Sequence, residues 1–475
     1  MYSKYLIVFA TSAFLYLTGF SQTDSRESYD LASCIAIALE NNLDLKQSGL
    51  QAESAGLALR QSKNNLLPNL NVDYNLGINN GRSINPSTND FINERLSFSN
   101  VGLGGQATLF NAFRLKNSIK QNQFNVGAAE MEQEEVRQNL ILNVTLSYIQ
   151  ILTARDQMRL AEARLETTAG QVERLRANFE EGAGNPADYT DMQGQYSMDE
   201  MAVLAAKNSL NEAILNLFVS MGIEASPQAD FADISDENLE EEKYLLTAEA
   251  VYQDALANLP TFKARQLRIE EANSAIKVAR ADFFPEISLF GQIGSNFSSV
   301  SRAFFETGSE VKETGDFVSL NNQAIPVLSN ETNFRQEKIA YLDQLNNNRN
   351  SVVGVAVSIP IFNRFQAKNQ ISQRKLDLRQ STIDLQNSKL QFKQAVEDAH
   401  FKMENAYARY QILKRQLEAY ESSYRINEIR FTNGVSNIVQ YLTSKNNLDT
   451  ARLNLSNAKF EYILRVRILE YYRGL

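Results

Sequence analysis

Four segments of the chain alternate strictly between apolar residues and small or polar residues. They predict strands over about 69–78, 100–109, 286–297 and 351–361. Each segment is roughly ten residues long with one apolar face, as a tilted strand between lipid and an aqueous lumen requires. A soluble antiparallel sheet packed against helices would alternate in the same way, and this alternative stays open. Four matched segments in an otherwise helical chain favour the membrane sheet.

Four strands are too few to close a membrane barrel, because spanning barrels begin at about eight strands. A cyclic trimer of such protomers would supply twelve strands. Two connections of unequal length join the strands, at about Gly81–Asn100 and Ser298–Asn350, and long loops of such barrels lie on the outer face. Within the longer one, Glu331–Asn347 is a candidate local helix.

The chain carries a tandem duplication. The matched residues, 252 apart (431 − 179 and 441 − 189), are Phe179, Gly182, Asn185 and Tyr189 against Phe431, Gly434, Asn437 and Tyr441. Ahead of these blocks a second correspondence runs at a separation of 217, as between Pro68 and Pro285. The difference of 35 residues (252 − 217) must lie between Pro285 and Phe362, which is the region of the longer connection. The protomer is therefore expected to contain two similar repeats.

Two long stretches without proline, Asn111–Glu180 and Asn363–Thr432, predict helices on the order of 100 Å long. In the second stretch, mainly apolar residues recur at alternating spacings of three and four, a heptad seam that predicts a left-handed supercoil. The seam residues are Val396, Ala399, Met403, Ala406, Tyr410, Leu413, Leu417, Tyr420, Tyr424, Asn427 and Phe431. The same seam runs from Val144 to Phe179 in the first repeat.

Each long helix is expected to end at a glycine turn and to return as a helix about half as long. Glycine permits the left-handed backbone that a helix end needs, at Gly182 and at Gly434. Return helices are expected over about 187–221 and 438–472, and leading helices over about 29–66 and 247–283. Placed end to end, one leading and one return helix would match one long helix. Each repeat is then a coiled-coil hairpin that bears a two-stranded ribbon.

Residues 1–21 have the features of a secretory signal peptide: a basic residue, an apolar run from Leu6 to Leu17, and small residues before Gln22. Beyond it we divide the chain into a first repeat, 22–224, an acidic connector, 225–246, and a second repeat, 247–475. The connector is expected to be solvated. Because no other run of 18 apolar residues exists, a membrane crossing is expected to use strands.

The chain has 475 residues and a net charge of −9, which argues against nucleic acid as a partner, because nucleic acid attracts basic patches. Cys34 is the only cysteine and follows Leu31-Ala32-Ser33, a sequence that resembles a lipidation box. The charged run Asp24–Asp30 separates it from the apolar region, however. We therefore interpret Cys34 as a small apolar residue on a helix face, with lipidation as the alternative.

No catalytic constellation is found in the sequence. His400, the only histidine, lies next to the seam position Ala399, where a structural role is expected. No cluster of histidine, cysteine and carboxylate residues has metal-ligand spacing, and neither a nucleophile elbow nor a phosphate-binding loop is present. We therefore expect no enzyme activity, no metal and no cofactor.

The residues at this point resemble the outer-membrane efflux proteins, the TolC-like export ducts. The resemblance runs from Asp30-Leu31 to Gly474. It rests mainly on the duplicated helix ends at Phe179–Tyr189 and Phe431–Tyr441 and on the strand entries at Leu67-Pro68 and Phe284-Pro285. It implies a mainly α fold with a membrane β-barrel, in which three protomers form a twelve-stranded outer-membrane barrel continuous with a periplasmic α-helical barrel.

The resemblance also implies where partners bind. The glycine turns would form a periplasmic tip that meets a periplasmic adaptor protein and, through it, an inner-membrane pump of the RND or ABC type. The tip residues are Phe179, Gly182, Gly184, Asn185, Asp188, Phe431, Gly434, Ser436 and Asn437. Entrance-constricting positions would fall at Asp188, Gln440 and Thr443, of which the last two are neutral. The family's charged latch is absent, because its arginine and tyrosine would fall at Ser436 and Phe431.

The favoured hypothesis is a passive exit duct in the cell outer membrane, with a long periplasmic extension and contacts to outer-membrane lipid. It would serve a tripartite efflux or type I secretion system. The alternative is a soluble periplasmic coiled-coil scaffold or adaptor protein, in which the alternating segments would form a water-exposed sheet. The exported substrate does not follow from these residues.

Overall fold

A computed structural model of the protein describes residues 28–85, 89–182, 185–225, 229–233 and 243–474. The expected signal peptide, Gly184 and much of the acidic connector lie outside these residues. The described chain is mainly helical with one four-stranded sheet. It forms two compact units. The helical unit comprises the described residues up to Ser48, then Gln133–Pro260 and Leu390 onward, and the sheet unit comprises Gly49–Glu132 and Thr261–Lys389.

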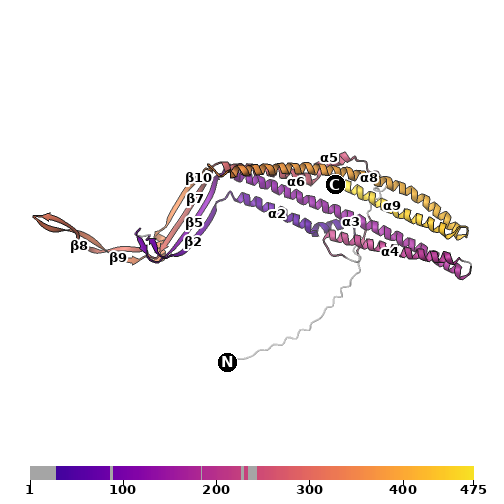
Figure 1. Ribbon diagram of the computed structural model, residues 1–475, viewed down its shortest axis with the longest axis horizontal. Coiled ribbons are helices and arrows are strands. Elements are labelled where there is room, and N and C mark those ends of the chain that lie inside the picture. The colour runs from indigo at the N-terminus through magenta and orange to yellow at the C-terminus, as the bar shows by residue number, and fades with distance from the viewer. Residues whose placement is uncertain (1–27, 86–88, 183–184, 226–228, 234–242, 475) are drawn as a thin grey trace, which may run out of the picture. The chain divides into compact units, whose positions relative to one another are not determined.

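The sheet unit contains the four strands predicted from alternation. They are β2 (Asn69–Asn79), β5 (Leu96–Phe110), β7 (Glu286–Ser298) and β10 (Asn350–Ser358). Figure 1 shows their order, β10-β7-β5-β2, and every neighbouring pair is antiparallel. Within this sheet β2 and β10 are the edge strands, each bonded on one side only.

One face of the sheet is apolar and exposed. Cross-strand register aligns Val72 with Leu103 and Leu103 with Ile293, so these side chains share a face. Val353 is 78% exposed on the same face, and the others are exposed too. Asn71, Gly104 and Gln292 align in the adjacent row on the opposite, more polar face. The alternation in the sequence thus becomes one apolar and one polar surface.

The longer strand connection is a β-hairpin, which corrects the expected helix over Glu331–Asn347. Strand β8 (Arg302–Leu320) pairs with β9 (Gln323–Lys338), and only Tyr341–Asn347 forms a helix, α7. Pairing with β8 gives the backbone from Glu331 to Lys338 cross-strand partners, and the Phe304 and Phe334 rings pack edge to face. The shorter connection carries β3 (Arg82–Ile84) and β4 (Phe91–Asn93).

Helix α7 is fastened to the sheet by buried polar contacts. Gln344 accepts a hydrogen bond from the Ser298 backbone amide at 2.9 Å and donates to the Ser298 carbonyl at 3.0 Å. The hydroxyls of Tyr341 and Ser99 lie 3.0 Å apart. These contacts hold α7 against the end of the sheet at which β7 finishes.

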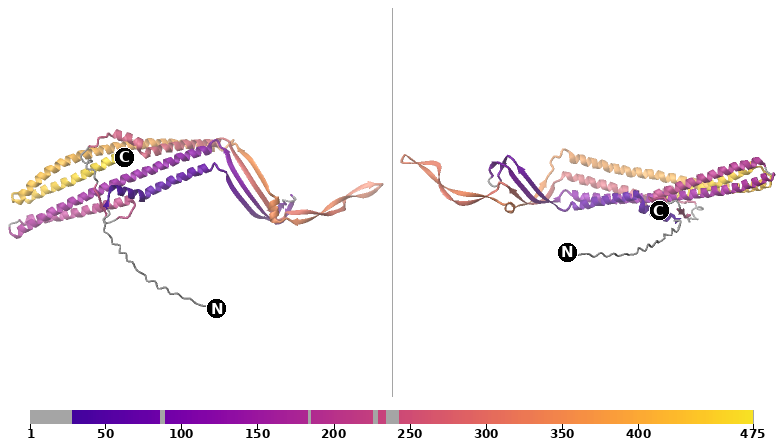
Figure 2. Two further views of the ribbon diagram at one scale, coloured as in Figure 1. Left: turned by 180° about the vertical axis from the view of Figure 1, so that it is seen from behind. Right: turned by 90° about the horizontal axis from the view of Figure 1, so that it is seen from below.

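The helices of the two repeats have matching bounds. Long helices α3 (Arg114–Glu180) and α8 (Gln366–Thr432) are each 67 residues, and return helices α4 (Pro186–Met221) and α9 (Ile438–Arg473) are each 36 residues. Figure 2 shows α4 beside α3 and α9 beside α8. Corresponding ends differ by 252 (366 − 114 and 473 − 221), the separation found in the sequence. The predicted seam residues of α3 and α8 are buried or half-buried, apart from Phe179.

Each leading helix is broken, whereas one continuous helix was expected. The first consists of α1 (Leu31–Asn41) and α2 (Leu43–Asn64), and the second of α5 (Ala248–Asn258), α6 (Pro260–Arg280) and the short 3-10 helix η1 (Ala281–Phe283). In both repeats the break in the leading helix lies beside the C-terminal end of a return helix. Asn42 donates to the Ser220 carbonyl, and Asn258 donates to the Arg473 carbonyl. The capping glycines Gly222 and Gly474 allow this approach, since a Cβ on either would lie 3.1 Å or less from the facing chain.

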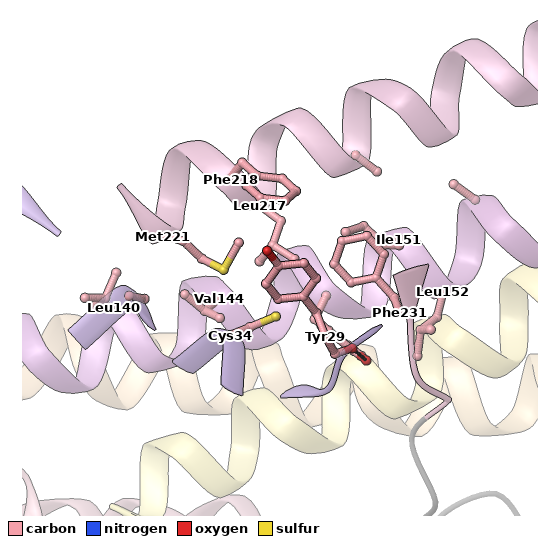
Figure 3. Close-up of a cluster of buried hydrophobic side chains, with 14 residues drawn as sticks. Tyr29, Cys34, Leu140, Val144, Ile151, Leu152, Leu217, Phe218, Met221 and Phe231 are labelled. Atoms are coloured by element: carbon pink, nitrogen blue, oxygen red, sulfur yellow. Dashed lines mark hydrogen bonds between the residues drawn. The ribbon is translucent and has the colours of Figure 1, made fainter. Parts of the chain in front are cut away.

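A hydrophobic core in the helical unit joins α1, α3 and α4 (Figure 3). It contains Cys34 from α1, Val144 and Ile151 from α3, and Phe218 from α4. Cys34 is fully buried in the figure's centre, as the packing interpretation of this residue requires. A second core joins α5, α8 and α9 around Val251, Met403 and Tyr462.

The described residues of the connector are only partly packed: the segment around Phe231 is packed, whereas Asp230, Asp233 and Lys243 are exposed, as a solvated connector requires. Strand β6 (Asp230–Phe231) pairs with β1 (Ser28–Tyr29), and Phe231 is buried in the first core. The Tyr148 hydroxyl lies 2.6 Å from the Ala232 carbonyl oxygen, and burial raises the pKa of Tyr148 to about 12, so the hydroxyl stays a donor. His400, its counterpart in the second repeat, lies 3.0 Å from the Leu246 carbonyl oxygen through Nε2, the structural role expected of it.

Candidate functional site: the hairpin turns and the buried charges behind them

The described residues of the two hairpin turns have similar backbone conformations. Gly182 has a φ of +75° and Gly434 a φ of +70°, and each amide donates to a carbonyl three residues earlier at 3.0 Å. The following helices are capped by asparagine: Asn185 accepts from the Ala187 amide and Asn437 from the Gln440 amide. Left-handed glycine and an asparagine cap together explain why both copies turn at this point.

An aromatic pair lies behind each turn, in unlike surroundings. The Phe431 and Tyr441 rings stack with centroids 4.8 Å apart, and the Phe179 and Tyr189 rings stack at 6.0 Å. Phe431 is 9% exposed, but Phe179 is 43% exposed. Leu175 and Met192 of the first hairpin pack against the second pair and form one cluster with it. The predicted tip residues of the two repeats are therefore not equivalent.

Arg174 joins the two hairpins, although the sequence interpretation did not select it. Its guanidinium lies 5.3 Å from the centroid of the Phe431 ring and donates to the Thr432 hydroxyl at 2.9 Å. The counterpart of Arg174 in the second repeat, 252 residues on, is Ile426. That departure from the duplication is the signal in the sequence that could have identified this contact.

The three positions expected to constrict an entrance make local hydrogen bonds. The Asp188 carboxylate accepts from the Asn185 side-chain amide at 3.2 Å, inside the first turn of α4. Gln440 accepts from the Ser436 hydroxyl at 2.9 Å, and Thr443 donates to the Val439 carbonyl at 2.7 Å. Each contact lies within one turn region and links no other helix, so a constriction built by several copies stays a prediction.

Farther from the turns, four charged side chains meet where α3, α4 and α9 pack together. Asp199 of α4 is fully buried and accepts from the Thr168 hydroxyl at 2.5 Å and from the Gln195 amide at 2.8 Å. Arg164 Nε of α3 lies 2.6 Å from Asp199 Oδ1, although not in line for a hydrogen bond. Lys445 Nζ of α9 lies 2.9 Å from an Asp449 carboxylate oxygen and 3.5 Å from one of Asp199. We call Arg164, Asp199, Lys445 and Asp449 the charge cluster.

The charge cluster is absent from the duplicated pattern. The counterparts of its members are Gln416 for Arg164, Ala451 for Asp199, Gln193 for Lys445 and Ser197 for Asp449. None of these counterparts carries a charge, so the cluster belongs to the contact between unlike hairpins. Sequence reasoning missed it because the partners come from three helices distant in the chain.

Polar contacts continue along α3 and α9. The Gln157 amide donates to the Asn457 side-chain oxygen at 2.6 Å, and the Ser456 hydroxyl donates to Asp156. Beside them lies a cavity of about 360 Å³, lined partly by Ala161, Ala202 and Ser209. We call these contacts, together with the charge cluster, the polar seam.

Two further features are absent from the described residues. No helix in that part of the chain is long and apolar enough to cross a membrane. No group of three or more histidine, cysteine or acidic residues there could hold a metal ion.

Comparison with known proteins places this architecture in a family. The model of the outer membrane efflux protein family matches residues 34–223 and 251–470, one match in each repeat. TolC of Vibrio cholerae serotype O1 is 22% identical over 440 residues, which cover 92% of this chain and 89% of TolC. The alkaline protease secretion protein AprF of Pseudomonas aeruginosa is 23% identical over 446 residues, 92% of this chain and 83% of AprF.

The fold agrees with solved structures of such proteins. The outer membrane protein VceC from Vibrio cholerae superposes with a TM-score of 0.71 at 16% identity, covering 93% of this chain and 95% of VceC. These relatives are named as outer membrane proteins and a secretion protein. Since the family model matches most of both repeats, the chain belongs to the outer membrane efflux protein family.

Proposed function

We propose that three copies of the chain pair their sheet edges into one twelve-stranded barrel, which opens through the helical hairpins into the periplasm. As a member of its family the chain is an outer-membrane exit duct of an efflux or secretion system. The main observation behind this proposal is the four-stranded sheet. Its edges, β2 and β10, have free sides, and its apolar face is exposed. Such edges need partners, and such a face needs lipid.

Trimer formation satisfies both needs at once. Edge β2 of one copy would pair with β10 of the next, and ring closure would leave no edge. The apolar face, with Val72, Leu103 and Ile293, would then contact lipid on all sides. The polar face, with Asn71 and Gln292, would line the lumen. A soluble scaffold would leave the same apolar residues in water, so the exposed face and the family membership disfavour that alternative.

The hairpin turns would form the inner end of the duct and dock onto a periplasmic adaptor. Four tip residues are exposed in two similar turns: Gly182, Asn185, Gly434 and Asn437. Exposed turns of this kind can contact the helical hairpins of a partner protein. An inner-membrane pump would supply the energy through that adaptor, because a passive duct has no energy source of its own.

Edge-to-edge crosslinking tests the proposal. In a Cys34→Ala background, cysteines replace Asn75 on β2 and Ala356 on β10, both on the polar face, and a short thiol crosslinker is added to membranes. Covalent trimers are expected from the paired variant, and no trimers from either single variant. A matched pair on central strands, Gln106→Cys with Ser288→Cys, should crosslink only within a chain. A detergent-purified protein with the mass of one chain, or one soluble without detergent, would contradict the proposal.

A further inference from the structure

Helix α7 contacts the apolar face of the sheet through Tyr341. The Tyr341 hydroxyl lies 3.3 Å from that of Tyr74 and 3.0 Å from that of Ser99, and its ring packs against Phe297 with centroids 4.8 Å apart. Cross-strand register aligns Tyr74 with Val101 and Ser99 with Phe297, all within the alternation of the apolar face. Because β7 begins beside the helices and finishes at α7, this is the outer end of the proposed duct. In that duct α7 lies on the lipid-facing side.

Four basic residues lie at the same end of the sheet. Lys338 is the last residue of β9, shortly before α7, and Arg349 stands between α7 and β10. Arg302 begins β8 and is the cross-strand partner of Lys338. Arg95 immediately precedes β5, which starts where the antiparallel β7 finishes. We call Arg95, Arg302, Lys338 and Arg349 the basic patch.

No member of the basic patch forms an ion pair with a carboxylate in the part of the chain that the structure describes. The Arg302 guanidinium donates to the Ser299 carbonyl at 2.9 Å and to the Ser301 carbonyl at 3.0 Å. Arg349 donates to the Asn346 carbonyl at 2.9 Å. These backbone contacts orient the two guanidinium groups without neutralising them.

Two of these cations are directly opposite each other across the β8–β9 ladder. Arg302 pairs in register with Lys338, and like charges in this position repel each other and destabilise the ladder. An anion bound beside both side chains would replace this repulsion with two attractions. Phosphate is suited to such a place, because guanidinium groups bind its oxygens in pairs and an ammonium adds a point charge.

Charge is separated along the β8–β9 hairpin. Residues 303–337 carry two cations and six carboxylates, a net charge of −4 (2 − 6), and both of those cations form ion pairs within the hairpin. The basic patch has a net charge of +2 (4 − 2) even when the adjacent Glu94 and Asp343 are counted with it. Unpaired positive charge is therefore concentrated where the apolar face ends.

We propose that the basic patch binds the phosphate groups of a phosphorylated lipid whose acyl chains lie along the apolar face beside α7. The proposal rests on the proposed duct, which puts that face in the membrane. Leu342 of α7 is 74% exposed and adds apolar surface next to the cations. Long basic side chains keep their stems on apolar surface while their charged ends reach the headgroups, and each attracts anionic lipid. Free phosphate shares the anionic group but has no chains to contact this face.

Binding of diphosphorylated lipid A tests the proposal. The purified protein in non-ionic detergent is titrated with this lipid, and native mass spectrometry counts the bound molecules. Lys338→Gln with Arg349→Gln removes two exposed cations of the patch, and we expect about 30-fold weaker binding, since each cation near a membrane surface contributes roughly fivefold. Lys312→Gln with Arg335→Gln is the matched control, because it removes the same charge farther along the same hairpin. The control should bind lipid A like the unchanged protein.

Two further ligands identify the source of the phosphate. Lipid A without its phosphates should bind far more weakly to the unchanged protein, and millimolar inorganic phosphate should leave bound lipid A in place. Equal binding of the dephosphorylated lipid would overturn the proposal, because apolar contact alone would then suffice. Displacement by inorganic phosphate would overturn it too, because the patch would then recognise the free ion.

Equal weakening in the two double variants would also contradict the proposal, since only net charge would then matter. If the first double variant does not fold, Arg95→Gln with Lys338→Gln replaces it at two exposed positions. Failure of both to fold would overturn the proposal, because the patch would then serve folding. The mass measurement separates this proposal from the duct: lipid A bound specifically to a single chain would contradict only the trimer, whereas trimers that bind no lipid A would contradict only the lipid site.

Discussion

The two helical hairpins have the same sequence plan and the same bounds, yet their turn regions are packed differently. In the second hairpin Phe431 and Tyr441 are buried beneath Leu175, Met192 and Arg174 of the first. In the first hairpin the equivalent Phe179 is 43% exposed. Duplication therefore fixed the secondary structure of both copies, whereas the contact between unlike copies determines which aromatic pair becomes a core.

This difference matters for a closed ring. If hairpins alternate around the duct, each first hairpin covers one second hairpin of its own chain and leaves its other side for a neighbouring chain. Phe179 and Tyr189 are then the surface that a neighbour would cover. Residues unique to one copy, such as Arg174 and the charge cluster, mark the contact within the chain.

The largest expected effect comes from the second aromatic pair. Tyr441 is fully buried, so Tyr441→Ala should lower the free energy of unfolding by about 3–5 kcal/mol, the usual cost of removing a buried ring. Tyr189→Ala, at the half-buried counterpart, should cost about 1 kcal/mol. Denaturant unfolding in detergent, followed by helical circular dichroism, measures both.

Equal losses of unfolding free energy in these two variants would show that the two aromatic pairs are packed alike, which would contradict the difference between the hairpins. A loss of stability from Tyr189→Ala that appears only in the trimer would indicate that a neighbouring chain covers Phe179 and Tyr189. Measurement of trimer dissociation beside unfolding separates these outcomes.

A second effect concerns the glycine turns, where the two hairpins should respond alike. Gly182→Ala and Gly434→Ala should each cost about 1–2 kcal/mol, because both glycines have positive φ while a Cβ would meet nothing within 4 Å. Lysine at either position should also reduce adaptor crosslinking while the trimer stays intact. Gly170→Lys, at an exposed helical glycine with open space around it, should leave adaptor crosslinking unchanged. Full crosslinking in the Gly182 and Gly434 variants would remove the turns from the proposed interface.

The sequence predicted the regular parts of the fold better than its interruptions. Heptad spacing and absence of proline were enough for α3 and α8, because long helices depend on local pattern. The breaks at Asn42 and Leu259 were missed, although Pro260 is a helix-start signal at N1. Their cause is tertiary, since the end of a return helix abuts each break.

The hairpin β8–β9 and the charge cluster show two further limits. Asn321 and Asn322 both have positive φ, so an Asn-Asn turn directs the chain back into β9 where a helix was expected. That signal was present in the sequence. The charge cluster was less accessible, because Asp199 and Lys445 are 246 residues apart and heptad analysis does not indicate which helices of different hairpins meet. Departures from the duplicated pattern would have identified its members.

A third, smaller effect tests the contact within the chain. Arg174→Met should cost about 1–2 kcal/mol, because it removes the guanidinium over the Phe431 ring and the hydrogen bond to Thr432. Arg176→Met is the control, since Arg176 is exposed and pairs only within its own helix. Its unfolding curve should match that of the unchanged protein. Indistinguishable curves for both variants would mean that Arg174 does not link the hairpins.

The smallest expected effect concerns the rate at which a buried thiol in each leading helix reacts with an alkylating reagent. Cys34 and Val251 occupy corresponding positions (251 − 34 = 217), and both are fully buried. Burial raises the pKa of the Cys34 thiol from 9.0 to about 11, and the nearby Asp30 carboxylate is a second, smaller cause. At pH 8 the native thiol should therefore react with iodoacetamide at least about 100-fold more slowly than in the unfolded chain, because only the thiolate attacks.

The same protection should appear at the second leading helix. In Cys34→Val with Val251→Cys, the new thiol lies in the corresponding core and should be equally slow to react. The raised pKa of Cys34 means that the folded state favours the neutral thiol. The resulting contribution to the stability of the folded state is complete below pH 9 and is lost as the pH rises toward 11. Labelling followed by intact mass measures both thiols. Rapid labelling of native Cys34 would contradict its role as the packing counterpart of Val251, and a lipid-modified mass would restore the lipidation alternative.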